Sequence, residues 1–188
     1  TPEGGLAVAL HGPCEAEADV AGGGARVRLR VDTEYPFGET LRLRLSLTAP
    51  ARFPLRIRAP WWAEGAQVMA PGGGEVAALP GAFCELTREW NDGDEVRVWF
   101  PMRPRLETGH RGMISVLAGP LLFGLRIEER WRRIAGKPPV ADWEIWPGSP
   151  WNYGLALDPA RPVDSQIRIE RTVLADAPAA DSEESAAP

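Results

Sequence analysis

Asp142 and Glu144 have the spacing closest to that of a catalytic carboxylate pair. A glycosidase needs two carboxylates roughly 5 to 10 Å apart across a cleft, and residues i and i+2 of a strand share a face at about 7 Å. Glu128 and Glu129, as neighbours, would point to opposite faces. Because acidic pairs are common on exposed strands, we interpret Asp142 and Glu144 as solvated surface and predict no catalytic residue.

The histidines and cysteines show no pattern of nucleophilic or metal chemistry. His11 and His110 lie far apart, and no serine or cysteine stands in a nucleophile context; we expect structural or surface histidines. Cys14 and Cys84 could form one disulfide, but they lack the spacing of metal ligands. We favour two buried free thiols and predict no metal site in this chain.

The tryptophans are the only strong candidates for ligand binding. Eight occur in 188 residues, and an indole face can stack on a sugar ring. Aromatic side chains also bury large areas and hold loops on a sheet, so we favour core or inter-domain packing over a sugar platform. The candidates for substrate contact are Trp61 and Trp62, after a strand ending near Pro60, and Trp146 and Trp151, which flank a Pro-Gly-Ser-Pro turn.

The elements that would position these residues are strands, because the hydrophobic period is two. Apolar residues alternate with arginine or polar residues over 26–32, 41–48 and 55–59, so each strand has one apolar and one charged face. The 20 glycines and 19 prolines disfavour long helices. About nine to eleven short strands at regular spacing predict an all-β, antiparallel β-sandwich, jelly-roll-like in form. Gly93 is expected at positive φ in the hairpin loop 91–94.

One domain is predicted over 1–175. Within it, residues 131–152 carry four tryptophans and several prolines, and we expect an ordered excursion that these aromatics hold in place. A strand over 153–157 and another over 166–173, with Ile167 and Ile169 inward, would follow. Residues 176–188 are alanine, proline, serine and acidic residues, which predicts a disordered tail.

Charge and hydropathy exclude several partners. The net charge is −5, and the arginines are interspersed with acidic residues, whereas nucleic-acid binding shows a net basic footprint. No apolar run approaches the roughly 18 residues of a membrane span. The compartment is not determined by the sequence, and of the two options we favour the cytoplasm over secretion.

Several segments together resemble the C-terminal β-sandwich region of the β-L-arabinofuranosidase-type enzymes, glycoside hydrolase family 127, formerly a domain of unknown function. The similar segments include Pro60-Trp61-Trp62-Ala63 and Arg88-Glu89-Trp90-Asn91-Asp92-Gly93-Asp94. In order along the chain, the segments are 33–37, 53–63, 80–83, 88–94, 100–105, 119–123 and 150–153. Their shared order makes the resemblance specific over about two thirds of the chain.

The resemblance implies a bacterial parent with a helical (α/α)6 catalytic barrel followed by β-sandwich domains. It implies a retaining mechanism with a cysteine nucleophile beside a zinc-binding cluster, in an adjacent-cysteine stretch of the barrel that we expect before Thr1. Neither Cys14 nor Cys84 matches that stretch, so no catalytic residue and no cofactor is carried over; zinc would belong to the barrel.

We therefore expect a non-catalytic accessory domain, inactive in isolation, whose partner is the parent's own barrel. The alternative is an independent carbohydrate-binding module that uses exposed tryptophans. The arginine-rich strand faces are either solvated or paired with acidic groups of the barrel. If the domain docks, a sheet face or tryptophan patch should form a contiguous apolar surface larger than a few hundred Å².

Overall fold

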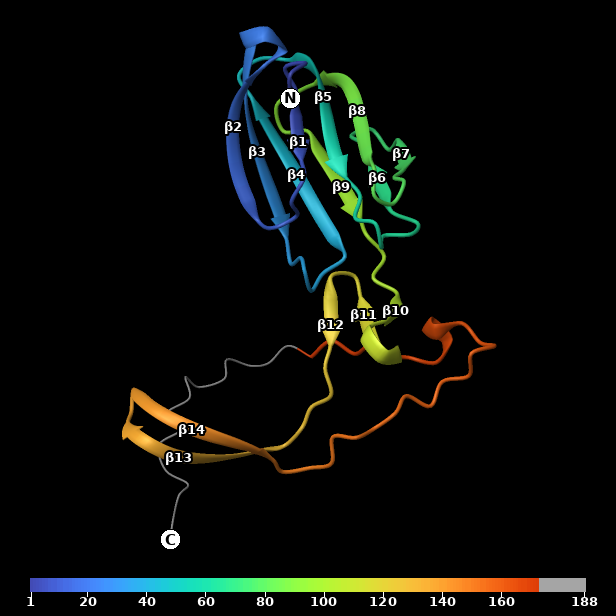
Figure 1. Ribbon diagram of the computed structural model, residues 1–188. Coiled ribbons are helices and arrows are strands. Elements are labelled where there is room, and N and C mark those ends of the chain that lie inside the picture. Colours follow the sequence, from blue (N-terminus) through green and yellow to red (C-terminus); the bar gives the residue numbers. More distant parts are fainter. Residues whose placement is uncertain (173–188) are drawn as a thin grey trace.

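The computed structural model describes residues 1–172, and the tail predicted for 176–188 lies outside them. The described residues form fourteen strands and three short 3-10 helices, η1 (Ala21–Gly23), η2 (His110–Gly112) and η3 (Val163–Ser165) (Figure 1). The predicted all-β, sandwich-like class is confirmed. None of the described helices is long and apolar enough to cross a membrane.

A six-stranded antiparallel sheet forms one layer of the sandwich, with the order β2-β3-β4-β9-β6-β7. Its regular pairing follows from the period-two sequence, because β3 and β4 alternate strictly between buried and exposed residues over most of their length. The strands are β2 (Cys14–Val20), β3 (Ala25–Thr33), β4 (Thr40–Leu47), β6 (Gln67–Met69), β7 (Glu75–Ala77) and β9 (Glu95–Trp99).

The second layer is a three-stranded sheet with the order β1-β5-β8. It contains β1 (Leu6–Val8), β5 (Ala51–Arg58) and β8 (Phe83–Trp90). The β5–β8 pair is antiparallel, but β1 runs parallel to β5, which the expected antiparallel pattern did not include. The loop 91–94 joins β8 to β9 across the two layers, so the expectation of a hairpin loop was wrong: β8 pairs with β5, and β9 pairs with β4 and β6. Gly93 has the predicted positive φ of 84°.

The core lies between these layers and draws its residues from Val8 to Phe100. Leu41, Leu43 and Leu45 of β4 are fully buried, as their alternation predicts. Trp90 is also fully buried, and its Nε1 donates a hydrogen bond to the Phe53 carbonyl at 3.0 Å. The indole N–H is therefore satisfied inside an otherwise apolar core.

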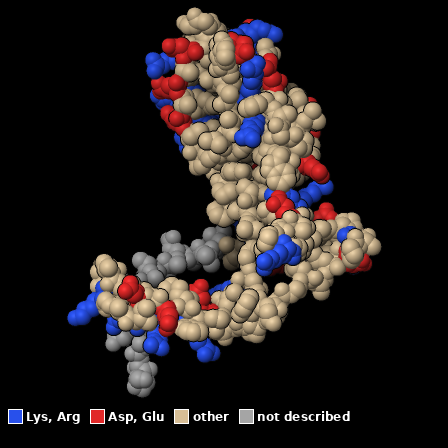
Figure 2. All heavy atoms as spheres, in the orientation of Figure 1, with Lys and Arg blue, Asp and Glu red and all other residues tan. Residues whose placement is uncertain are grey.

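Six arginines of the sandwich pair with carboxylates of the same chain, whereas Arg42, Arg52 and Arg58 make no ion pair with the described residues. Arg28 donates to Glu17 at 2.6 Å, and Arg56 donates to Glu85 across the β5–β8 pair at 2.7 Å. Figure 2 shows the resulting mixture of blue and red side chains over the sandwich. These exposed pairs are screened by water, and they require no acidic surface from another domain.

Residues after 102 form separate, smaller sheets. One contains β10 (Pro104–Thr108), β11 (Ile114–Ala118) and β12 (Leu121–Phe123); the other is a two-stranded ribbon of β13 (Glu129–Lys137) and β14 (Val140–Pro147). In Figure 1 the ribbon extends away from the sandwich. Only Ala118 and Gly119 are buried among residues 103–172, so the sandwich core ends near residue 100. The domain boundary at 175 stays a prediction.

Three local expectations for this part were wrong. Residues 153–157 and the described part of 166–173 are not strands, because no neighbouring strand lies there to pair with them. The excursion 131–152 is a ribbon whose aromatics do not hold it on the sandwich: Trp131, Trp143, Trp146 and Trp151 are 46–65% exposed.

The Glu39 carboxylate ties the sandwich to the segment that leads into β10. It accepts hydrogen bonds from Trp99 Nε1 at 2.9 Å and from the Met102 backbone N–H at 2.6 Å. One side chain just before β4 therefore fixes the point at which the chain leaves the sandwich.

Candidate functional site

The pocket around Trp61 brings together three segments that are distant in sequence. The loop after β5, the start of β10 and helix η3 enclose a cavity of about 350 Å³. We call it the Trp61 pocket. Its lining combines indole rings with charged side chains: Trp61, Trp62, Glu64, Pro101, Arg103, Pro104, Arg105, Val163 and Asp164.

Trp61 and Trp62 have different roles in this pocket. Trp62 is half-buried and meets Phe100 edge to face, with ring centroids 6.3 Å apart, so it anchors the loop on the core. Trp61 is 62% exposed. The Arg105 guanidinium lies over its ring, 4.7 Å from the centroid, in a cation–π contact that orients the indole.

Arg105 has hydrogen-bonding capacity to spare. One terminal nitrogen donates to the Gly119 carbonyl at 2.7 Å, and the other lies 3.4 Å from Glu107 Oε1. Its Nε is buried and has no partner within the described residues. A buried N–H without an acceptor is costly, and because this atom has almost no exposed surface, a ligand in the pocket does not reach it in this conformation.

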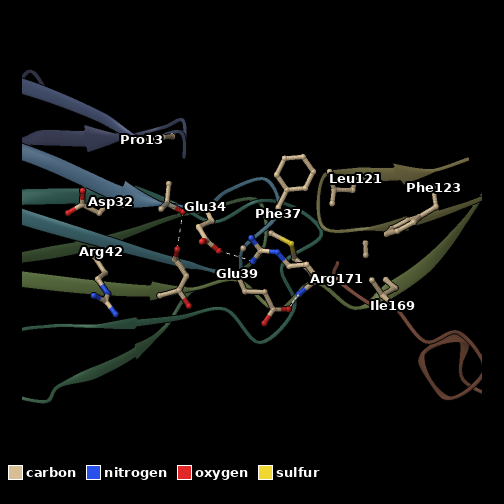
Figure 3. A pocket seen from close by; sticks show the side chains of 15 residues that line it. Pro13, Asp32, Glu34, Phe37, Glu39, Arg42, Leu121, Phe123, Ile169 and Arg171 are labelled. Atoms are coloured by element: carbon tan, nitrogen blue, oxygen red, sulfur yellow. Dashed lines mark hydrogen bonds and ion pairs between the residues drawn. The ribbon is translucent and has the colours of Figure 1, made fainter. Parts of the chain in front are cut away.

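A larger groove, of about 1010 Å³, separates the end of the sandwich from the β10–β12 sheet. Figure 3 shows Phe37 and Phe123 on its opposite sides, with Glu34 pointing toward Arg171. That ion pair, at 2.8 Å, joins positions 137 residues apart. The groove is a junction between the sandwich and the β10–β12 sheet. Its lining does not have the arrangement of a set of catalytic groups.

The two faces of the β13–β14 ribbon differ, but both carry charged groups: on the face with most of the apolar residues, Arg133 pairs with Trp143 and Glu129 accepts a hydrogen bond from Trp131 Nε1. Trp131 pairs with Ile145, and Trp143 lies diagonally from Trp131 with ring centroids 6.1 Å apart. On the other face, Arg132 pairs with Glu144, which also accepts from Trp146 Nε1. We call the surface of Trp131, Trp143 and Ile145 the ribbon face; no described part of the chain buries it.

The structure brings together only two of the four predicted substrate-contact residues. Trp61 and Trp62 share the pocket, whereas Trp146 lies on the side of the ribbon away from the ribbon face and Trp151 in the coil after β14. Whether any of them contacts substrate stays a prediction. Asp142 and Glu144 lie on β14, and Glu144 is engaged with Arg132 at 3.9 Å and with Trp146, as expected of surface groups.

His11 is a structural histidine in this fold. Its Nε2 donates to the Arg58 carbonyl at 2.8 Å, and its ring packs edge to face on Tyr35 and Phe100. Burial lowers the pKa of His11 below the ordinary 6.5, the Arg58 charge adds to this effect, and the hydrogen bond opposes it. His11 therefore stays neutral inside the sandwich near neutral pH.

The two cysteines do not fit a zinc site. Both are free; Cys84 is buried but Cys14 is exposed, which corrects the expectation of two buried thiols. They lie in different sheets, on β8 and β2. No group of three or more histidine, cysteine or acidic residues in the described part of the chain could hold a metal ion.

The sandwich part of the chain matches a known protein family. Residues 5–102 match the family model described as β-L-arabinofuranosidase, GH127 middle domain. The chain belongs to the GH127 family. The matched residues coincide with the sandwich and its core, so the predicted resemblance is confirmed, although the family description places this region in the middle of its proteins. No curated protein matches the chain.

Solved structures share the fold of this chain. A GH127 β-L-arabinofuranosidase from Geobacillus stearothermophilus T6 is 19% identical, with a TM-score of 0.55 over 75% of this chain and 30% of its own. A GH127 β-arabinofuranosidase is 20% identical, with a TM-score of 0.55 over 77% and 28%. A protein titled glycoside hydrolase is 25% identical, also at 0.55, over 62% and 20%.

The chain thus spans less than a third of the length of these structures. It is a domain of a GH127 protein.

Sequence reasoning did not find the polar residues of the Trp61 pocket or the ribbon face. Arg103 and Arg105 come from a Pro-rich segment that has no periodicity, and Asp164 is distant in sequence. The ribbon face did carry a signal, since Trp143 and Ile145 alternate with charged residues. The glycines and prolines around these residues disfavoured regular strands, so the alternation was not interpreted as a ribbon.

Proposed function

We propose that this domain is a non-catalytic accessory β-sandwich that packs against the catalytic part of its GH127 protein. The observation that carries the proposal is the distribution of exposed apolar side chains. Within residues 1–102 such side chains are scattered, whereas from Met113 to Leu155 they occur in nearly every segment, at exposures of 37–82%.

The ribbon is the part that most needs a partner. An isolated two-stranded ribbon is at best marginally stable in water, and this one has no buried residue. Most of its apolar residues lie on one face, as in a sheet with one face covered. The aligned part of this chain covers only 20–30% of each matched structure, and the additional polypeptide of a GH127 protein is the covering surface that we propose.

The alternative function is an independent carbohydrate-binding module in which several exposed tryptophans form one platform. Trp61, Trp146 and Trp151 do not share one, because only Trp61 lines the pocket.

The experiment is a turnover assay of aryl β-L-arabinofuranosides with the 188-residue chain and with the longer GH127 protein that contains it. The proposal predicts no turnover by the chain alone and turnover by the longer protein. Turnover by the purified chain that is lost in an Asp142→Asn, Glu144→Gln variant would contradict the accessory role.

A further inference from the structure

The Trp61 pocket has a lining that is not accounted for by packing within this chain. It carries two guanidinium groups, from Arg103 and Arg105, and two carboxylates, from Glu64 and Asp164. Several charged side chains elsewhere are joined in pairs, such as Arg28 with Glu17 at 2.6 Å, whereas others, such as Arg52 and Arg58, make no ion pair with the described residues.

The charges of the pocket are not paired in this way. Among the described residues, Glu64, Arg103 and Asp164 make no ion pair and no side-chain hydrogen bond, and Arg105 pairs only with Glu107, at 3.4 Å. The polar groups of the lining are thus available to a ligand.

The balance of charge indicates the class of ligand. Two positive and two negative groups give the pocket no net preference for an ion. A hydroxyl group can donate to a carboxylate and accept from a guanidinium, so a ligand rich in hydroxyl groups would use both kinds of side chain.

Trp61 supplies the apolar part of such a site. The Arg105 guanidinium lies over the ring, and the side chain remains 62% exposed, which leaves indole surface open to stack on the C–H face of a sugar ring. Trp62 is held on Phe100 and keeps the loop in position. The volume, about 350 Å³, is near the lower end of ligand pockets, which run from about 300 to 1,000 Å³, and suits one or two sugar units.

We propose that the Trp61 pocket binds a neutral saccharide, with Trp61 stacking on the ring and Arg105, Glu64 and Asp164 binding its hydroxyl groups. This site is a binding subsite of the domain and carries no reaction. It is independent of the ribbon face, so docking and saccharide binding can each fail without the other.

The test is affinity gel electrophoresis of the 188-residue chain in arabinan, xylan and galactan, together with NMR of the indole N–H signals during titration with L-arabinose. We expect at least one polysaccharide to retard the chain and the Trp61 indole signal to shift. Trp61→Ala should weaken binding about tenfold or more. Trp131→Ala is the matched control, because Trp131 is 56% exposed and lies outside the lining, and it should bind like the parent chain.

Asp164→Asn keeps the test decisive if Trp61→Ala fails to fold, because Asp164 is exposed and its change leaves the core intact. It should also weaken retardation. The proposal is overturned if none of the three polysaccharides retards the chain and L-arabinose shifts no indole signal. It is equally overturned if Trp61→Ala and Asp164→Asn, both folded, bind as well as Trp131→Ala.

Discussion

Trp131 and Trp143 meet edge to face across the β13–β14 ribbon, with an interplanar angle of 77°, and each remains about half exposed. An aromatic pair of this kind stabilises a strand pair, but half of its surface still faces water. Ile145 extends the same surface. This arrangement is expected where a further protein surface covers the pair, and the ribbon face is therefore the feature on which the accessory role depends.

Replacing Trp143 with serine should weaken the attachment of this domain to the rest of the GH127 protein. Buried tryptophans at interfaces commonly contribute about 2 kcal/mol or more, and we expect a loss of that size in the longer protein, measured by urea unfolding. Trp146→Ser is the matched control, since Trp146 lies on the same strand but on the other face. In the isolated chain both variants should change stability by less than about 0.5 kcal/mol. Equal losses of stability from both variants in the longer protein would contradict docking through the ribbon face.

The sandwich core should respond to truncation quite differently from the later sheets. Leu45 is fully buried and Leu122 is 67% exposed. Leu45→Ala should lower the free energy of unfolding by about 2–5 kcal/mol, because it leaves a cavity, whereas Leu122→Ala should cost less than about 0.5 kcal/mol in the isolated chain. Chemical denaturation of both variants measures this. A large loss from Leu122→Ala would show that the β10–β12 sheet shares the core.

The sequence predicts the secondary structure of a segment well or poorly according to how that segment is buried. β3, β4 and β5 were predicted closely, because one face is buried and the other solvated, and alternation then records the fold. The ribbon and the coil 148–162 were not, because neither side of these segments is buried within this chain. Arg105 and Asp164 are brought to the Trp61 pocket by the tertiary fold. The spacing of residues in the sequence does not predict such contacts.

Stability should fall in mild acid because of His11. The pKa of His11 is lowered in the folded protein by burial, while the unfolded chain keeps the ordinary value near 6.5, so the unfolded state binds the proton first as the pH falls. The contribution is therefore complete above about pH 6.5 and is lost as the pH drops toward the folded pKa.

Urea unfolding of the parent chain and of His11→Gln, between about pH 7.5 and pH 5.5, measures this effect. His11→Gln should be less stable overall and show a shallower pH dependence, whereas His110→Gln, at an exposed position, should keep the slope of the parent chain. An unchanged slope in His11→Gln would assign the acid sensitivity to other groups.

The two thiols should differ in reactivity. Cys14 is exposed, whereas Cys84 is buried and burial raises the pKa of its thiol, which lowers both its access to reagent and its thiolate fraction. Titration with a thiol reagent should modify one cysteine in the native chain and two in denaturant, and Cys14→Ser should abolish the native reaction. Rapid native modification of Cys84 would show that the β5–β8 sheet opens readily.

Hydrogen exchange at the β13–β14 ribbon tests the accessory role most directly. The backbone amides of Glu129–Lys137 and Val140–Pro147 should exchange rapidly in the isolated 188-residue chain, because no described residue covers the ribbon. In the longer GH127 protein they should exchange at least about tenfold more slowly, which corresponds to 1.4 kcal/mol, while the amides of β4 should be protected in both. Equal, rapid exchange of the ribbon in both proteins would contradict the proposal that this domain docks through the ribbon face.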